Sequence, residues 1–336
     1  MEDSKKINLL VSIIIPNWNG REFLKTCLDS ISVQDYENFE VIVIDCASSD
    51  RSAGFVKKNY PKVRLIELKE DKGPTNALNI GIKESKGNYI LLLNNDVILS
   101  SNCLATLVLE LQQDENSAIS PVELDWNKKF GGGGAIFSPG RILKFLSPFV
   151  KSSEIAPFWP PTACCICTKQ TLLDNPLNEH FFMYEDFEWG WRLHLKKTKI
   201  KICFSTAFLH KGGAATEKAS PKQTFLDGRA LISSCFICLK MPTFFLLLPL
   251  ILLQYLENSL FYIEQFKWRA LLAYWRGFLD FLLRIKIFIK DRKKVQKERI
   301  ISDWEVIKIM INGIKFRKFA REKWYQQDKS FLQNIA

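Results

Sequence analysis

Short apolar runs alternate with segments of helical spacing in the N-terminal part of the chain. The runs predict strands at residues 10–15, 39–44, 63–68 and 89–93. Between them, apolar residues that recur every three or four positions predict helices at residues 21–32, 51–59 and 76–85. Continuous apolar strands separated by helices are typical of a parallel sheet that helices cover on both faces. We therefore expect an α/β fold with a mostly parallel, Rossmann-like sheet.

The middle of the chain is less regular. Residues 160–168 predict another strand, and a helix is expected to start near Glu185 after an aromatic loop. The glycines at 131–134 predict a flexible loop. This loop does not resemble a phosphate-binding loop, because no Gly-Lys-Ser/Thr follows it and no strand leads into it. We expect the α/β domain to occupy residues 1–240.

Residues 241–336 are expected to form a helical, membrane-associating region. Residues 244–253 are apolar, but Gln254, Glu257 and Asn258 interrupt the run before it reaches the about 20 residues that span a bilayer. We interpret the run as an interfacial or re-entrant element. Basic residues then alternate with apolar residues at helical spacing, as in a membrane-surface helix. The apolar positions are Trp268, Leu271, Leu272, Trp275, Phe278, Leu279 and Leu282.

The net charge of +11 is concentrated at the C-terminal end of the 336-residue chain. From residue 264 onward there are 18 Lys and Arg against 8 Asp and Glu, so the rest of the chain is nearly neutral. A basic segment of this kind predicts an anionic partner. Because its tryptophans and leucines recur at helical spacing, an anionic membrane surface fits better than a nucleic acid.

The nine cysteines are expected to be reduced and mostly buried. Residues 1–8 are polar and the apolar run at 9–15 is too short for a signal core, so no cleavable export signal is expected. Cys235 and Cys238 have the spacing of half a zinc site, but no second pair matches it, and we expect no metal there. The expected location is cytoplasmic, or at the cytoplasmic face of the cell membrane.

Acidic residues occur where three predicted elements begin or end. Asp45 ends the second strand, Asp96 follows the fourth, and Glu185 and Asp186 begin a helix. Each has an ordinary explanation when taken singly: a turn residue, a helix cap, or a first-turn carboxylate favoured by the helix dipole. Ligands of open α/β sheets, however, bind beyond the carboxyl ends of the strands. A buried carboxylate without a partner is also costly, which favours a cation near Asp96.

Six segments, in this order along the chain, resemble the inverting family 2 glycosyltransferases with a GT-A fold. They are VSIIIPNWNG, VIVIDCASSD, GPTNALNIGI, GNYILLLNNDV, FFMYEDFEWGWRL and LHKGGAAT. The glycine-rich segment and the basic aromatic tail look most like the rhamnosyltransferase-like branch. The resemblance implies transfer from a nucleotide-sugar donor, dTDP- or UDP-linked and including dTDP-rhamnose. It implies a saccharide or lipid-linked glycan as acceptor, in cell-surface polysaccharide synthesis.

The resemblance implies a nucleotide pocket after the first two strands. Pro16 and Asn17 would line the base pocket, and Asp45 would accept the imide N–H of a pyrimidine. Uracil and thymine share this hydrogen-bonding edge, so Asp45 would accept either. Cys46 stands where the family usually has Asn, so the turn after Asp45 is expected to be held differently.

The resemblance also implies a metal site. Asn94, Asn95 and Asp96 correspond to the family's Asp-x-Asp motif in an Asn-x-Asp form. Asp96 would hold Mg²⁺ or Mn²⁺ against the donor diphosphate, and His210 would contact the metal or the diphosphate. Both cations prefer oxygen ligands and can offset charge on the leaving group.

Asp186 corresponds to the family's catalytic base, which takes the acceptor hydroxyl proton as that oxygen attacks the sugar. Glu185 is expected to orient Asp186 or bind acceptor, and Arg192 to support the loop or the phosphates. Tyr184 and Trp189 are expected to bind the acceptor. They belong to an aromatic wall that also includes Phe181, Phe182 and Phe187.

Two other functions compete with the transferase. A catalytically inactive, membrane-surface carbohydrate-binding protein with the same fold is the alternative, and the presence of Asp45, Asp96 and Asp186 argues against it. A dehydrogenase is disfavoured because no Gly-x-Gly-x-x-Gly follows the first strand.

Overall fold

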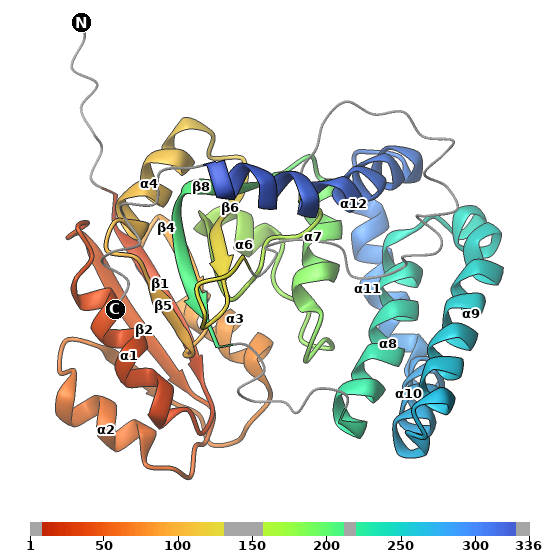
Figure 1. Cartoon of the computed structure of the whole chain (residues 1–336), viewed down its shortest axis with the longest axis horizontal. Coiled ribbons are helices and arrows are strands. Elements are labelled where there is room, and N and C mark those ends of the chain that lie inside the picture. The colour runs from red at the N-terminus through yellow and green to blue at the C-terminus, as the bar shows by residue number, and fades with distance from the viewer. Residues whose placement is uncertain (1–8, 131–156, 212–219, 327–336) are drawn as a thin grey trace, which may run out of the picture.

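The computed structural model describes residues 9–130, 157–211 and 220–326 (Figure 1). The expected glycine loop at 131–134 lies outside the described residues, as does most of the LHKGGAAT segment. Side chains at 313–318 are likewise not described.

One eight-stranded sheet organises the described part of the α/β region, in the order β3-β2-β1-β4-β7-β6-β8-β5. Four neighbouring pairs are parallel: β1–β2, β1–β4, β2–β3 and β6–β8. The pairs β4–β7, β6–β7 and β5–β8 are antiparallel. The expected mostly parallel sheet is therefore confirmed. The strands are β1 (Val11–Asn17), β2 (Phe39–Asp45), β3 (Arg64–Glu67), β4 (Tyr89–Leu93), β5 (Val97–Leu99), β6 (Ser117–Leu124), β7 (Cys164–Thr168) and β8 (Lys199–His210).

Helices cover both faces of the sheet because alternate residues of each strand point to opposite sides. Val11, Ile13 and Ile15 of β1 face one layer of helices, whereas Ile14 faces the other. The first layer contains α1 (Arg21–Ser32), α2 (Ser52–Asn59) and α4 (Cys103–Gln113). The second contains α3 (Pro74–Glu84), α6 (Lys169–Asp174) and α7 (Glu185–Leu195). The nine cysteines are buried and free, as expected.

Five helices follow the sheet, and the first four of them occupy the right of Figure 1. One cluster of buried side chains joins α7 to these helices and includes Phe187, Trp191 and Leu195. At the end of the chain, α12 crosses back over the sheet, where Trp324 packs with Leu124 of β6 (Figure 1). The helices are α8 (Pro221–Cys238), α9 (Met241–Glu264), α10 (Trp268–Leu283), α11 (Ile285–Glu298) and α12 (Asp303–Gln326).

The polar residues of α9 do not interrupt it, contrary to the expectation from the sequence. Gln254 and Ser259 are buried, and Asn258 donates to the Tyr274 hydroxyl of α10 at 2.7 Å. These polar groups thus face the neighbouring helices, and the 24-residue helix continues past them. Within the described residues, α9 is the one helix long and apolar enough to cross a membrane, by length and composition alone.

The exposed face of α9 is apolar, which is the reverse of a soluble surface helix. Leu246 is 76% exposed, and seven further large apolar residues of the helix are exposed with it. They are Phe245, Leu252, Leu253, Leu256, Leu260, Phe261 and Ile263. A contiguous exposed apolar surface of this kind marks an interaction site.

The apolar stripe expected to lie on a membrane is divided in the structure. Leu271, Trp275 and Phe278 pack against the buried cluster of the helices, so the expectation is wrong for them. Their neighbours on α10 remain exposed: Trp268, Leu272, Leu279 and Leu282. The expected helix at 265–290 is also two helices, α10 and α11, which meet at Arg284.

Two glycines allow α8 and α10 to cross at backbone contact. A Cβ at Gly277 would lie 2.1 Å from the Phe225 carbonyl oxygen, and one at Gly228 would lie 2.1 Å from the Tyr274 carbonyl oxygen. Since these contacts involve backbone atoms, no side-chain rotation could relieve them. The crossing therefore requires glycine at both positions.

We predict that Gly277→Ala lowers the free energy of unfolding by about 1–3 kcal/mol, because overpacking must separate the helices. Gly54→Ala is the matched control, since a Cβ at Gly54 meets nothing within 4 Å and the position is helical. That control should be neutral or stabilising by up to about 1 kcal/mol. Thermal melts of the full chain measure both. Equal melting temperatures for the two variants would contradict the close backbone contact between α8 and α10 at Gly277.

Candidate active site

A buried polar network lies at the carboxyl ends of β1 and β2. The two strands pair so that Asn17 lies opposite Asp45. The Asn17 amide donates to Asp45 Oδ1 at 2.9 Å and to Ser52 Oγ at 2.9 Å. Asn95 in turn donates to Asn17 Oδ1 at 2.8 Å. Asn17 therefore joins the ends of three parallel strands, next to Pro16, which is also buried.

Asp45 is only 3% exposed, yet it keeps some accepting capacity. Its Oδ1 accepts from Asn17 and Ser52, whereas its Oδ2 accepts from the Ser48 backbone N–H at 3.0 Å. Each carboxylate oxygen offers about two lone-pair sites, so Oδ2 can accept one more donor.

The turn after Asp45 is closed by the backbone at Cys46. The Cys46 N–H donates to the Asn17 carbonyl at 2.7 Å. Burial, with the nearby charges of Asp71 and Asp45, raises the pKa of Cys46 to about 12, so the thiol stays neutral. Cys46 therefore serves as a small apolar residue in this turn.

The strand pairing brings Asp96 and His210 together. Asp96 lies in the turn after β4, preceded by Asn94 and Asn95, and leads into β5. Because β5 runs antiparallel to β8, Val97 pairs with His210 at the end of β8. As a result, His210 Nε2 lies 3.3 Å from Asp96 Oδ1.

The His210 ring also contacts a residue that the sequence reasoning missed. Its Nδ1 lies 2.8 Å from Glu123 Oε1 on β6. Burial alone would lower the pKa of His210, but hydrogen bonds to Asp96 and Glu123 and their charges raise it to about 10. The ring is therefore an imidazolium between two carboxylates. A lone acidic residue in an apolar strand was the available signal for Glu123, as it was for Asp96.

A second pair of carboxylates begins α7. Burial, followed by the charge of Glu185, raises the pKa of Asp186 to about 8, and the charge of Glu123 adds to the rise. Burial also raises the pKa of Glu185, although Thr162 Oγ1 donates to its Oε1 at 3.0 Å. The two carboxyls titrate as a pair. The Asn94 N–H donates to the Ala163 carbonyl at 2.9 Å, and the preceding residue, Thr162, contacts Glu185, so the start of α7 lies near the turn that contains Asp96.

Tyr184, directly before this pair, adopts a left-handed backbone conformation with φ of 65°. It lies against Asp227 of α8, which the sequence reasoning also missed. Burial raises the pKa of Asp227 to about 6. Lys222 of α8 lies 4.6 Å from the centre of the Phe182 ring. The N-terminal half of α8 thus borders the aromatic loop.

The structure corrects the expected aromatic wall. Trp189 is 0% exposed, and its indole N–H donates to the Asn175 carbonyl at 2.9 Å. It lies on the core-facing side of α7, so the expectation that it binds acceptor is wrong. Phe181 and Phe187 are also buried. Among the expected wall residues, Phe182 and Tyr184 are the ones that stay partly exposed.

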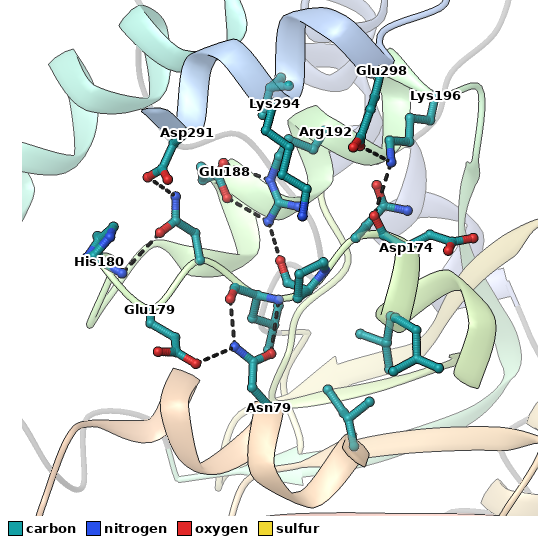
Figure 2. A pocket seen from close by; sticks show the side chains of 18 of the residues that line it. Asn79, Asp174, Glu179, His180, Glu188, Arg192, Lys196, Asp291, Lys294 and Glu298 are labelled. Carbon is teal, nitrogen blue, oxygen red and sulfur yellow. Dashed lines mark hydrogen bonds and ion pairs between the residues drawn. The ribbon is translucent and has the colours of Figure 1, made fainter. Parts of the chain in front are cut away.

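Arg192 lies in a pocket away from these carboxylates (Figure 2). The pocket has a volume of about 400 Å³, and its lining contains neither Asp96 nor Asp186. Figure 2 shows Arg192 paired with Glu188, through bonds of 2.8 and 2.9 Å, and a further bond joins it to the Pro176 carbonyl. Arg192 therefore supports the loop, and the expectation that it could reach the phosphates is wrong.

The donor chemistry of Asp96 and His210 fits a divalent cation. A carboxylate oxygen and an imidazole nitrogen lie 3.3 Å apart, and both are ligand types that a divalent cation accepts. Within the described residues, no group of three or more His, Cys, Asp or Glu side chains is arranged to hold a metal. Asp96 and His210 alone therefore do not complete the ligand set of a divalent cation.

Part of the α/β region is similar in sequence to known proteins. Residues 12–165 match the sequence profile described as Glycosyl transferase family 2. Glycosyltransferase GlyG of Streptococcus pneumoniae is 30% identical over 114 residues, which are 33% of this chain and 38% of that protein. An uncharacterized glycosyltransferase of Bacillus subtilis, EpsJ, is 34% identical over 110 residues, or 32% of this chain and 31% of that protein. The matches thus span well under half of these relatives, and they support a family 2 glycosyltransferase.

Solved structures resemble the described chain over most of its length. TarS 1-349 of S. aureus in complex with UDP-GlcNAc has a TM-score of 0.55 and 16% identity, covering 95% of this chain and 93% of that one. Mannosyltransferase PcManGT from Pyrobaculum calidifontis, in complex with GDP-Man and Mn²⁺, has a TM-score of 0.51 and 14% identity, covering 94% and 88%. At these identities the likeness shows the fold, which is GT-A with a C-terminal helical region.

We predict that Asp186→Asn stabilises the protein at high pH. Folding raises the pKa of Asp186 from 3.8 to about 8, so the folded state holds a proton that the unfolded state releases. Wild-type stability should therefore fall as pH rises from about 4 to about 8, and then level off. The variant cannot lose stability in this way. The difference between its melting temperature and that of the wild type should therefore grow between about pH 4 and about pH 8.

Asp29→Asn is the control of opposite sign. A hydrogen bond from Lys25 lowers the pKa of Asp29, so removing its charge should slightly lower the melting temperature above pH 4. If Asp186→Asn shows no pH-dependent gain, the carboxyl is not desolvated as described.

Proposed function

We propose that the chain is an inverting glycosyltransferase that moves a sugar from a nucleotide-sugar donor to a saccharide or lipid-linked glycan in cell-surface polysaccharide synthesis. The observation that carries the proposal is the meeting of two unlike acidic pairs. Asp96 lies 3.3 Å from His210 Nε2, and Asp186 with Glu185 begins α7 close to the same turn. The Asp96–His210 pair is suited to hold a cation with its diphosphate. The Glu185–Asp186 pair is suited to supply a catalytic base.

Asp186 is the proposed base. An inverting displacement needs a group that takes the acceptor hydroxyl proton as the oxygen attacks the anomeric carbon. Burial and the Glu185 charge raise the pKa of Asp186, which makes its ionised form a stronger base. Glu185, held by Thr162, keeps that charge beside it. Tyr184 is the aromatic neighbour proposed to contact the acceptor.

Asn17, Asp45 and Pro16 are proposed to line the nucleotide pocket, with the open lone pair of Asp45 Oδ2 accepting a base N–H. Asp96 and His210 would hold Mg²⁺ or Mn²⁺ beside Asn94 and Asn95. A bound cation supplies Lewis-acid stabilisation of the diphosphate leaving group. PcManGT was solved in complex with Mn²⁺ and its nucleotide sugar, which supports this cofactor class.

The donor is proposed to be a dTDP- or UDP-sugar, with rhamnose as the sugar suggested by the resemblance to the rhamnosyltransferase-like branch. UDP-GlcNAc in the similar TarS structure supports a pyrimidine nucleotide. The alternative function is that of an inactive carbohydrate-binding protein. A turnover assay distinguishes it from a transferase, because only the transferase consumes the donor.

We also propose that the exposed apolar face of α9 and α10 binds an anionic membrane surface. On α9, Gln254 and Ser259 are buried whereas five leucines point outward, as in helices that face lipid. The basic C-terminal segment contributes about 1 kcal/mol per Lys or Arg near such a surface. The proposed location is therefore the cytoplasmic face of the membrane.

We predict that Asp186→Asn lowers turnover by roughly 10²–10⁴-fold while donor binding persists, because the amide keeps the shape but cannot take a proton. The assay follows nucleoside diphosphate release from a panel of UDP-, dTDP- and GDP-sugars with Mn²⁺. Titration calorimetry measures binding of the same donors. Asp174→Asn, at an exposed carboxylate, is the control and should keep full turnover. If the Asp186→Asn variant turned over at the wild-type rate, Asp186 would not be the catalytic base.

We predict that the combined variant Leu246→Gln, Leu260→Gln and Leu272→Gln loses salt-resistant binding to anionic vesicles. These leucines are 76%, 58% and 66% exposed, and burying their apolar area in lipid is not screened by salt. Flotation at low and high salt measures binding.

The matched control changes Leu109 and Leu173, exposed leucines of the α/β region, to Gln. The control should float like wild type, with only partial release at high salt. Full-length protein that stays wholly in solution with anionic vesicles at low salt would contradict the membrane proposal.

A further inference from the structure

Glu123 occupies a special position in the sheet. β6 runs parallel to β8, and Glu123 pairs with Phe208. Paired residues in neighbouring strands point to the same side, and His210, two residues after Phe208, points to that side as well. Glu123 is the one residue of β6 that is not fully buried. The register therefore places its carboxylate beside the His210 ring.

The His210 ring is held from both sides. Glu123 Oε1 lies 2.8 Å from Nδ1, and Asp96 Oδ1 lies 3.3 Å from Nε2. The Glu123 contact is the shorter one, and it uses the nitrogen that faces away from Asp96. This contact fixes the rotation of the ring about its own side-chain bonds.

We propose that Glu123 is a positioning residue that holds the His210 ring so that Nε2 faces Asp96 and the cation bound there. The proposal rests on the proposed function. Because the Glu123 carboxylate occupies the Nδ1 edge of the ring, Nε2 is the ring nitrogen that is left facing Asp96. A carboxylate that accepts from the second ring nitrogen orients a ligating histidine and strengthens its binding.

Glu123 itself is not a ligand in this arrangement. It meets the ring on the Nδ1 edge, whereas Asp96 meets it on the Nε2 edge. One cation at the Asp96–Nε2 position therefore cannot also reach Glu123 at this ring orientation. This agrees with the finding that no three such side chains in the described residues are arranged around one metal position.

The test measures cation binding by the full chain without turnover. Titration calorimetry follows Mn²⁺ together with inorganic pyrophosphate, which supplies diphosphate oxygens without a base or sugar. Glu123→Ala should weaken this binding by about 10–100-fold. Glu123→Gln should bind close to wild type, because its amide oxygen still accepts from Nδ1. Glu37→Ala removes an exposed carboxylate before β2 and should change nothing.

Asp96→Ala separates failure of this proposal from failure of the proposed function. If wild type binds, Asp96→Ala does not, and Glu123→Ala binds like wild type, the positioning role is overturned and the metal site stands. Equal losses in Glu123→Ala and Glu123→Gln would also overturn it, since charge alone would then matter. Wild type that binds no Mn²⁺ with pyrophosphate would overturn both. Thermal melts confirm that each variant is folded.

Discussion

The candidate site depends on how several carboxylates can be buried near one another without repelling. The structure uses two different solutions side by side. Asp96 and Glu123 share the imidazolium of His210, which neutralises charge that burial would otherwise make unfavourable. Within the described residues no ion pair involves Glu185 or Asp186. Burial raises the pKa of each, so folding favours their protonated forms. One half of the site therefore keeps a place for a positive charge, and the other keeps a group that can give up and regain a proton.

Local patterns predicted the first part of the fold well because each strand and helix there buries residues next to it in sequence. The helix at 21–32 and the strand at 89–93 have the expected bounds, and Asp45 and Asp96 lie at strand ends as expected. β6 and β8 were not predicted. β8 pairs with both β5 and β6, and this long-range pairing brings His210 to Asp96 and Glu123. No periodicity within one segment reports which distant strand lies beside it.

The sequence was also ambiguous about which side of a helix faces the core. Trp189 follows Asp186 by three residues, yet it packs between α7 and the sheet. Aromatic residues suit both a core and a sugar-binding surface, so their presence alone did not distinguish the two. Asn258 and Gln254 suggested the end of an apolar helix, but neighbouring helices satisfy or bury them. In both cases the partner surface, which lies far away in sequence, determines what the side chain does.

The same packing connects Asp186 to the apolar surface. Arg229 of α8 donates to the His180 carbonyl at 3.0 Å and pairs with Asp280 of α10 at 3.1 Å. It thereby holds the loop that leads to Asp186 against the helices with the exposed leucines. One buried cluster includes Phe187, directly after Asp186, together with side chains from α8 to α12. Cores of this kind resist deformation because their side chains are closely packed. The position of the carboxylate is therefore fixed relative to the apolar face, and an acceptor held at a membrane on that face would meet Asp186 at a distance set by this core.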